Sequence, residues 1–142
     1  RLCTNEDNVV NYYGDVDSNL EIKLDTLDDL FGEAGEIDEV NDWVTYGLPL
    51  QRFREFGSHI KALDMLDESK LSSDHTVEIV KLLLGDAEYA HPEVNFKKFI
   101  KQVQQQLKSQ QKIFDPVRKR LEPWIKMKKL AKKYGKRGCT IQ

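Results

Sequence analysis

The spacing of apolar residues between positions 91 and 112 constrains the fold more than any other feature of the sequence. Apolar side chains recur there every three or four residues, so a helix would gather them on one face. They are Val94, Phe96, Phe99, Ile100, Val103 and Leu107. The preceding His91-Pro92 pair suits a helix start, because the N–H that proline lacks has no partner in a first turn. The pattern predicts the longest helix of the chain, with a glutamine-rich outer face.

Shorter patterns of the same period fill most of the chain from Thr26 onward, separated by glycine, proline and capping residues. We expect helices from Thr26 to Gly32 or Gly35, from Val40 to Val44, over 50–66 with a weak point at Gly57, from the capping cluster Ser72-Ser73-Asp74 to Gly85, after Asp115-Pro116, and from Pro123 to Gly135. Pro123 either kinks the helix after Asp115 or starts the last one. The sequence therefore predicts an all-α fold, a small bundle of five or six helices.

The two ends of the chain are expected to differ from this helical part. Residues 1–25 are predicted to form an irregular acidic N-terminal segment, 26–122 a helical domain, and 123–142 a basic C-terminal helix and tail. Residues that favour turns discourage regular structure in the first segment. They are Asn5, Asn8, Asn11, Gly14 and Asp15.

Charge is divided unevenly along the chain. Residues 1–71 carry 17 acidic and 6 basic side chains, whereas residues 72–142 carry 7 acidic and 16 basic ones. The formal net charge of −2 conceals this division. Two interpretations stay open. The basic half faces a negatively charged partner outside the molecule, or the two halves attract each other across one fold.

The densest basic stretch lies at the end of the sequence. It consists of Lys126, Lys128, Lys129, Lys132, Lys133, Lys136 and Arg137. The residues Cys139-Thr140-Ile141-Gln142 fit the C-a-a-X pattern, in which a prenyl group is attached to the cysteine. This end resembles the C-terminal tails of prenylated Ras-like GTPases, although Thr140 replaces the usual aliphatic residue. The resemblance implies a lipid on Cys139 and, together with the lysines, attachment to an anionic membrane.

The same cations could instead follow a phosphate backbone, with Trp124 and Tyr134 stacking on bases. A chain that starts at Arg1 and ends at Gln142 also fits a protein cut from a viral polyprotein by a protease that cleaves after glutamine. The alternative hypothesis is therefore a nucleic-acid-associated or viral assembly or replication accessory protein.

Motifs for catalysis or cofactor binding are absent from the sequence, including the glycine-rich phosphate loop, G-x-S-x-G and H-E-x-x-H. The histidines His59, His75 and His91 are 16 residues apart, which does not suit a metal site. We expect a non-enzymatic interaction or adaptor module without metal or cofactor. It would be cytoplasmic and membrane-associated, and would bind a protein partner or a second copy of itself. The candidate partner-binding residues are Trp124, Gln102, Gln105 and Gln106.

Overall fold

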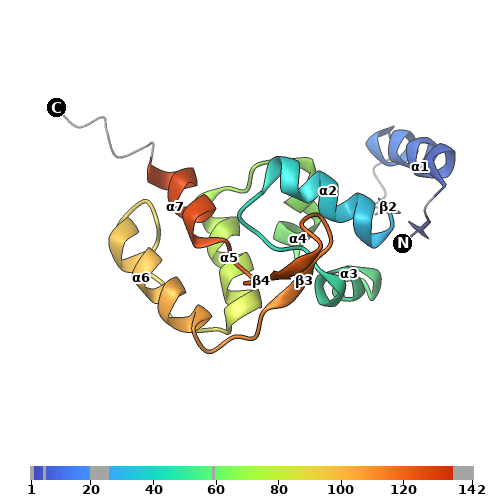
Figure 1. The fold of residues 1–142 in the computed structure, drawn as a ribbon. Coiled ribbons are helices and arrows are strands. Elements are labelled where there is room, and N and C mark those ends of the chain that lie inside the picture. The colour runs from blue at the N-terminus through green and yellow to red at the C-terminus, as the bar shows by residue number, and fades with distance from the viewer. Residues whose placement is uncertain (1, 5, 20–25, 59, 136–142) are drawn as a thin grey trace.

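The computed structural model describes residues 2–4, 6–19, 26–58 and 60–135 (Figure 1). Within these ranges the chain forms seven helices, α1 (Asp7–Asn19), α2 (Leu30–Val40), α3 (Leu48–Glu55), α4 (Lys61–Glu68), α5 (Ser73–Leu84), α6 (Phe96–Leu107) and α7 (Met127–Gly135). The four strands are very short. β1 (Leu2–Cys3) pairs in parallel with β2 (Thr26–Leu27), and β3 (Ile113–Asp115) pairs antiparallel with β4 (Arg120–Glu122). The mostly helical architecture predicted from the sequence is confirmed.

A single hydrophobic core connects α2, α4, α5, α6 and α7. The loop between α2 and α3 passes through this core, and its residues Trp43 and Val44 are each 1% exposed. Backbone hydrogen bonds join the loop to the segment before α7, from Thr45 N to Trp124 O at 2.9 Å and from Lys126 N to Trp43 O at 2.8 Å. These bonds fix the start of α7 against the centre of the molecule.

The helix α5 has the two ends that the sequence predicted. The Ser72 hydroxyl accepts a hydrogen bond from His75 N at 3.2 Å, which satisfies a donor that the first helical turn leaves unpaired. At the other end Gly85 has a φ of 102°, a conformation that residues with a Cβ rarely adopt. Local chemistry alone specified both boundaries.

The expected single helix over 50–66 is two helices, α3 and α4. Gly57 lies between them with a φ of 80°, in the left-handed region. Glycine was therefore a break and not merely a weak point, because this conformation cannot continue a right-handed helix.

The prediction for the segment from Thr26 to Val44 was wrong in detail. Thr26 lies in β2, and the helix cap is Asp29, whose carboxylate accepts hydrogen bonds from Phe31 N at 2.8 Å and Gly32 N at 2.9 Å. The glycines at 32 and 35 lie inside α2 and do not end it. One glycine costs a helix only about 1 kcal/mol, and burial of residues such as Ile37 exceeds that cost. After Val40 the chain forms a turn and a buried loop, where a helix was expected.

The N-terminal segment is not irregular throughout, because residues 7–19 form α1. The helix lies at one end of the molecule beside β2 (Figure 1). The turn-favouring residues in this segment therefore do not prevent a helix. The signal that indicates a helix is the spacing of Val9, Tyr13 and Val16. Residues 20–25, which also belong to the predicted N-terminal segment, lie outside the described residues.

The segment after Asp115-Pro116 is a β-hairpin and not a helix. The Asp115 carboxylate accepts hydrogen bonds from Val117 N at 3.0 Å and Arg118 N at 3.1 Å, as a helix cap would. However, Lys119 has a φ of 53°, which turns the chain back so that β4 pairs with β3. An aspartate accepts such bonds in turns and in helix caps, so the sequence pattern was ambiguous.

The last two helices agree with the sequence in type but not at their starts. Asn95 caps α6 by accepting a hydrogen bond from Lys98 N at 3.0 Å, whereas His91-Pro92 lies in the preceding turn. The helix has 12 residues, one fewer than α1, so it is not the longest. The helix α7 begins at Met127, after Pro123, and ends at Gly135 as predicted.

None of the helices in the described part of the chain is both long and apolar enough to cross a membrane.

Candidate functional site: a lysine-lined hollow beside the last helix

The helix α7 buries its apolar side, and this orientation determines which of its lysines are exposed. Leu130 is fully buried and Tyr134 is 6% exposed. The Tyr134 ring packs against Phe96 and Phe99 of α6, with centroid separations of 6.0 and 6.4 Å. Because this side of the helix is fixed in the core, the lysines are divided between positions that reach inward and positions that face solvent.

Three of the lysines predicted as a binding surface have partners within the molecule. Lys126 is 11% exposed and lies 3.2 Å from Asp38 and 3.0 Å from Asp115. Lys129 forms an ion pair with Asp42 at 2.6 Å. Lys133 donates to the Leu71 carbonyl at 2.7 Å and to the Thr76 hydroxyl at 3.0 Å.

These three members of the predicted binding surface therefore spend part of their charge within the fold. Lys126 in particular has a structural role, because it is largely buried and contacts two carboxylates.

Lys128 and Lys132 are the α7 lysines that remain exposed without an ion pair to any part of the chain that the structure describes. Lys70, in the loop between α4 and α5, is also exposed and has no such pair. Lys136, Arg137 and Cys139 lie outside the described residues.

Beside α7 lies a hollow of about 300 Å³ with an unusual concentration of positive charge. Its charged lining residues are four lysines and one aspartate, Lys70, Lys129, Lys132, Lys133 and Asp42. We call this hollow the lysine pocket. Val40, Asn41 and Trp43, at the end of α2 and in the loop after it, complete the lining. The pocket thus joins α7 to two segments that are distant from it in the sequence.

Asn41 holds two walls of the lysine pocket together. Its side-chain amide donates to Leu66 O and Ser69 O, both at 2.7 Å, and its carbonyl accepts from Leu71 N at 3.2 Å. The residue is 1% exposed. These three hydrogen bonds fix the backbone on both sides of Lys70, so this lysine is placed by a buried side chain and not by a mobile loop.

Trp43 supplies the aromatic part of the pocket lining. The Lys133 ammonium lies 5.3 Å from the centroid of the Trp43 ring and 5.6 Å from that of Tyr134, within the range of cation–π attraction. These contacts and the hydrogen bonds of Lys133 hold its charge at one position in the wall.

The predicted partner-binding residues do not form one surface patch. Both polar groups of the Gln102 amide have partners in the α5–α6 loop, since it donates to Glu88 O at 2.9 Å and accepts from Ala90 N at 2.8 Å. Gln102 therefore stabilises this loop. Gln105 is exposed and Gln106 is half-buried on α6. Trp124 is half-buried at a separate apolar hollow that Phe53, Leu82 and Leu83 also line.

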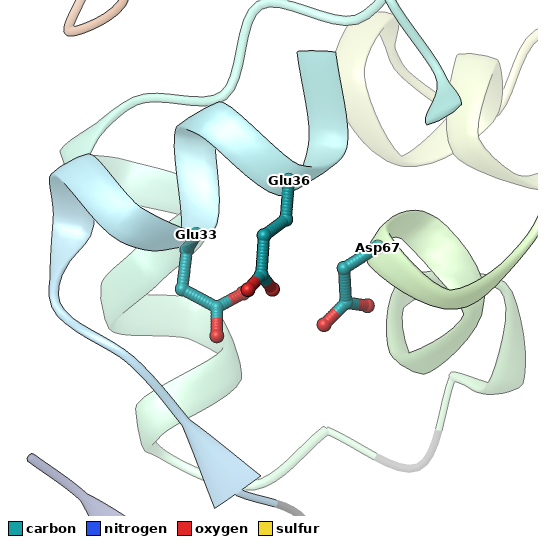
Figure 2. A group of neighbouring side chains, drawn as sticks. All are labelled: Glu33, Glu36 and Asp67. Carbon is teal, nitrogen blue, oxygen red and sulfur yellow. The ribbon is translucent and has the colours of Figure 1, made fainter. Parts of the chain in front are cut away.

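A second cluster of charged groups lies between α2 and α4. Figure 2 shows Glu33 and Glu36 projecting from α2 toward Asp67 on α4. One carboxylate oxygen from each of the three residues lies within 4.8 Å of those of the other two, and this separation suits a metal ion. However, Arg54 already provides a cation, with contacts of 2.6 Å to Glu33 and 3.3 Å to Asp67. We therefore interpret this cluster as a structural ion-pair network.

Burial dominates the electrostatics of this network. It is the largest cause that raises the pKa of Glu33 to about 7, the attraction of Arg54 opposes it, and the neighbouring Asp67 acts in the same direction as burial. Burial also raises the pKa of Glu36, as do the nearby carboxylates of Asp67 and Asp28. Several carboxyl groups share one guanidinium, so the cluster favours uptake of a proton.

Sequence reasoning missed several residues of both clusters, including Lys70, Asn41, Trp43 and Arg54. Lys70 is an isolated cation in an acidic half of the sequence, and its proximity to α7 follows only from the tertiary fold. Arg54 resembles its exposed neighbour Arg52 in the sequence. The one available signal was helical phase, because Arg54 lies four residues after Leu50 and shares its buried side of α3.

Comparison with protein-family models, with curated proteins and with solved structures gave no match.

Proposed function

We propose that the protein is a non-enzymatic helical module that binds anionic membrane surfaces through α7 and the adjoining lysine pocket. One observation carries the proposal. Lys70, Lys128 and Lys132 are exposed and have no carboxylate partner in the described part of the chain. Two of these three line the same hollow. Cations left unneutralised beside each other favour a negatively charged partner outside the molecule.

The strength of this attraction can be estimated. A lysine near an anionic leaflet contributes about 1 kcal/mol, so three contribute about 3 kcal/mol. Such binding is weak and reversible, and a further signal strengthens it. Lys136 and Arg137 follow α7 directly in the sequence and would add to the same attraction. The proposed module is thus recruited to a membrane and not permanently inserted in it.

A lipid surface fits the arrangement of charge better than a nucleic-acid duplex does. A duplex presents phosphates in regular rows, and a protein that follows them needs a row of available cations. Lys126, Lys129 and Lys133 have internal partners, and Lys70 and Lys132 line one hollow. Duplex binding is therefore an alternative outcome of the test.

Vesicle co-sedimentation tests the proposal. The wild-type protein should bind vesicles of phosphatidylcholine and phosphatidylserine but not of phosphatidylcholine alone. The double variant Lys128→Ala/Lys132→Ala should bind about thirtyfold more weakly, since it lacks about 2 kcal/mol of attraction. The control Lys97→Ala/Lys101→Ala removes the same charge from exposed positions of α6 and should bind within about twofold of wild type.

Two results would overturn the proposal. In the first, wild-type protein does not co-sediment with anionic vesicles. In the second, both double variants lose affinity equally, which would indicate attraction by total charge without a binding surface. Affinity for a DNA duplex, measured against salt concentration, completes the experiment. If the affinity for DNA falls steeply with salt concentration and the protein does not bind vesicles, the nucleic-acid alternative is established.

A further inference from the structure

We infer that the lysine pocket is a specific site for a phosphomonoester, the singly substituted phosphate group found on phosphorylated lipid headgroups and on small sugar phosphates. The inference rests on the proposed function, because it names the group that the membrane-binding surface would select. The distinction is between attraction to any anionic leaflet and recognition of one dianionic group.

Charge is the first argument for this ligand. A phosphomonoester carries about −1.5 to −2 near neutral pH, whereas the phosphodiester of an ordinary lipid carries about −1. The pocket is lined by four lysines against a single aspartate. Placing like charges around one hollow is unfavourable, and a compact dianion relieves this repulsion more completely than a monoanion does.

The origin of the lysines is the second argument. Lys129, Lys132 and Lys133 project from α7, whereas Lys70 comes from the loop between α4 and α5. A helix surface whose lysines merely face solvent does not need a fourth cation from a distant segment. The buried Asn41 side chain fixes that segment through Leu66 O, Ser69 O and Leu71 N.

Size and rigidity are the third argument. A hollow of about 300 Å³ lies at the lower end of the range for small-molecule sites, and suits a phosphate with part of its attached sugar. Asp42 orients Lys129, and the Leu71 carbonyl orients Lys133. A ligand would have to order only the side chains of Lys70 and Lys132, which lowers the entropic cost of binding.

The phosphomonoester could belong to a lipid or to a soluble molecule, and two probes separate these sources. The first probe is a set of vesicles that contain a phosphatidylinositol monophosphate, compared with phosphatidylserine vesicles of equal surface charge. The second is soluble inositol trisphosphate, titrated by calorimetry into the full chain. Wild-type protein should prefer the phosphoinositide vesicles by about tenfold, the value of one hydrogen bond to a charged group.

Three single variants then locate the preference. Lys70→Ala and Lys132→Ala remove cations of the lysine pocket and should lose most of the tenfold preference. Lys128→Ala is the matched control, because Lys128 is exposed on the same helix and does not line the pocket. It should weaken binding to both kinds of vesicle by a similar factor, about fivefold, and keep the preference.

Each outcome decides between the two levels of the proposal. Equal binding of both vesicle types by wild type would overturn the phosphomonoester site and leave the membrane function standing. Loss of the preference in Lys128→Ala, to the same extent as in Lys132→Ala, would also overturn it. Binding of inositol trisphosphate that depends on Lys70 and Lys132, without vesicle binding, would support the site and overturn the membrane function.

Discussion

Arg54 is a charged residue that the fold buries almost completely. It is 1% exposed, it contacts Glu33 and Asp67, and its guanidinium carbon lies 5.9 Å from the centroid of the Tyr46 ring. The neighbouring Tyr46 already has its own hydrogen-bond partner, since its hydroxyl donates to Gln51 Oε1 at 2.7 Å. Burial of an arginine is tolerated only because its partners compensate for the lost hydration.

Replacing Arg54 should therefore be severely destabilising. Arg54→Met keeps much of the side-chain volume but leaves the buried Glu33 carboxylate without its cation, at a cost of about 3–5 kcal/mol. Arg52→Met is the control, because Arg52 lies on the same helix with its side chain 62% exposed and pairs only with Glu55 among the described residues. It should change stability by less than about 0.5 kcal/mol. Urea unfolding measures both values, and equal effects would contradict the structural role of Arg54.

Glu33 makes stability depend on pH in a definite direction. Its pKa is raised from 4.5 to about 7 in the folded protein, so between these values the folded state holds a proton that the unfolded state releases. The resulting stabilisation is complete below pH 4.5 and is lost as the pH rises toward 7. Glu36 acts in the same direction, since its pKa is also raised.

Glu33→Gln tests this linkage. Glutamine does not titrate and still offers an oxygen to Arg54, so the variant should lose less stability than wild type as the pH rises from 4.5 to 7. We expect the difference between the two curves to change by roughly 1–3 kcal/mol over this interval. Denaturant unfolding at a series of pH values provides the measurement. Parallel curves for the two proteins would show that Glu33 is not the group responsible.

At the scale of elements, the sequence predicted what short-range chemistry determines. The ends of α5 follow from a serine that caps the helix and a glycine with positive φ, and both were predicted correctly. One of the errors occurred where the same side chain serves two structures. Asp115 accepts hydrogen bonds from the next two N–H groups of its turn, as it would in a helix cap, and the outcome depended on Lys119 and on pairing with β4.

The candidate site was predictable only in part, for a similar reason. Helical phase agrees with the burial of Leu130 and Tyr134 and with lysines elsewhere on α7, although the nucleic-acid hypothesis had assigned Tyr134 to base stacking. It does not predict that Asp38 and Asp115 enclose Lys126, or that Lys70 lies near Lys132. Those relations arise from contacts between segments distant in the sequence, which no local pattern contains.

The hairpin and α7 are joined to α2 by one charged network. Lys126 lies between Asp38 and Asp115, and Arg118 donates to Asp38 at 2.8 Å. Burial would raise the pKa of both aspartates, but hydrogen bonds from Arg118 and Lys126 lower each below its ordinary value of 3.8. This contribution to stability is present above pH 3.8 and is lost on further acidification.

Lys126 and Lys128 should consequently respond differently to the same substitution. Lys126→Met removes the cation between two carboxylates and should destabilise the protein by about 1–3 kcal/mol. Lys128→Met, two residues further along, removes an exposed lysine and should change stability by less than about 0.5 kcal/mol. Thermal or urea unfolding distinguishes them. If Lys126→Met were neutral, the network would not be what fixes α7 to α2.

At the scale of the whole molecule, some acidic residues of the first half form ion pairs with basic residues of the second half. Asp38 and Asp42 of the acidic half pair with Lys126 and Lys129 of the basic half. These internal pairs support attraction between the two halves of the sequence. Lys128 and Lys132 of the basic half keep their charge exposed, and the anionic partner that they would face stays a proposal. The strength of the proposed binding surface depends on how much of the positive charge the acidic half neutralises.

Asp42 gives a direct test of this balance, because it is the one carboxylate among the charged residues that line the lysine pocket. Asp42→Asn should release Lys129 and strengthen binding to anionic vesicles by about fivefold, the effect of one additional cation. Its exposed ion pair contributes only about 0–1 kcal/mol to stability, so the fold should persist.

Asp86→Asn is the matched control for total charge. Asp86 is exposed, pairs with Lys81 at 3.3 Å and does not line the pocket, yet its substitution changes the net charge by the same amount. If affinity follows the charge of the pocket, Asp42→Asn gains and Asp86→Asn does not. If the affinity of both variants rises equally, binding depends on the net charge of the whole molecule and not on α7 and its pocket.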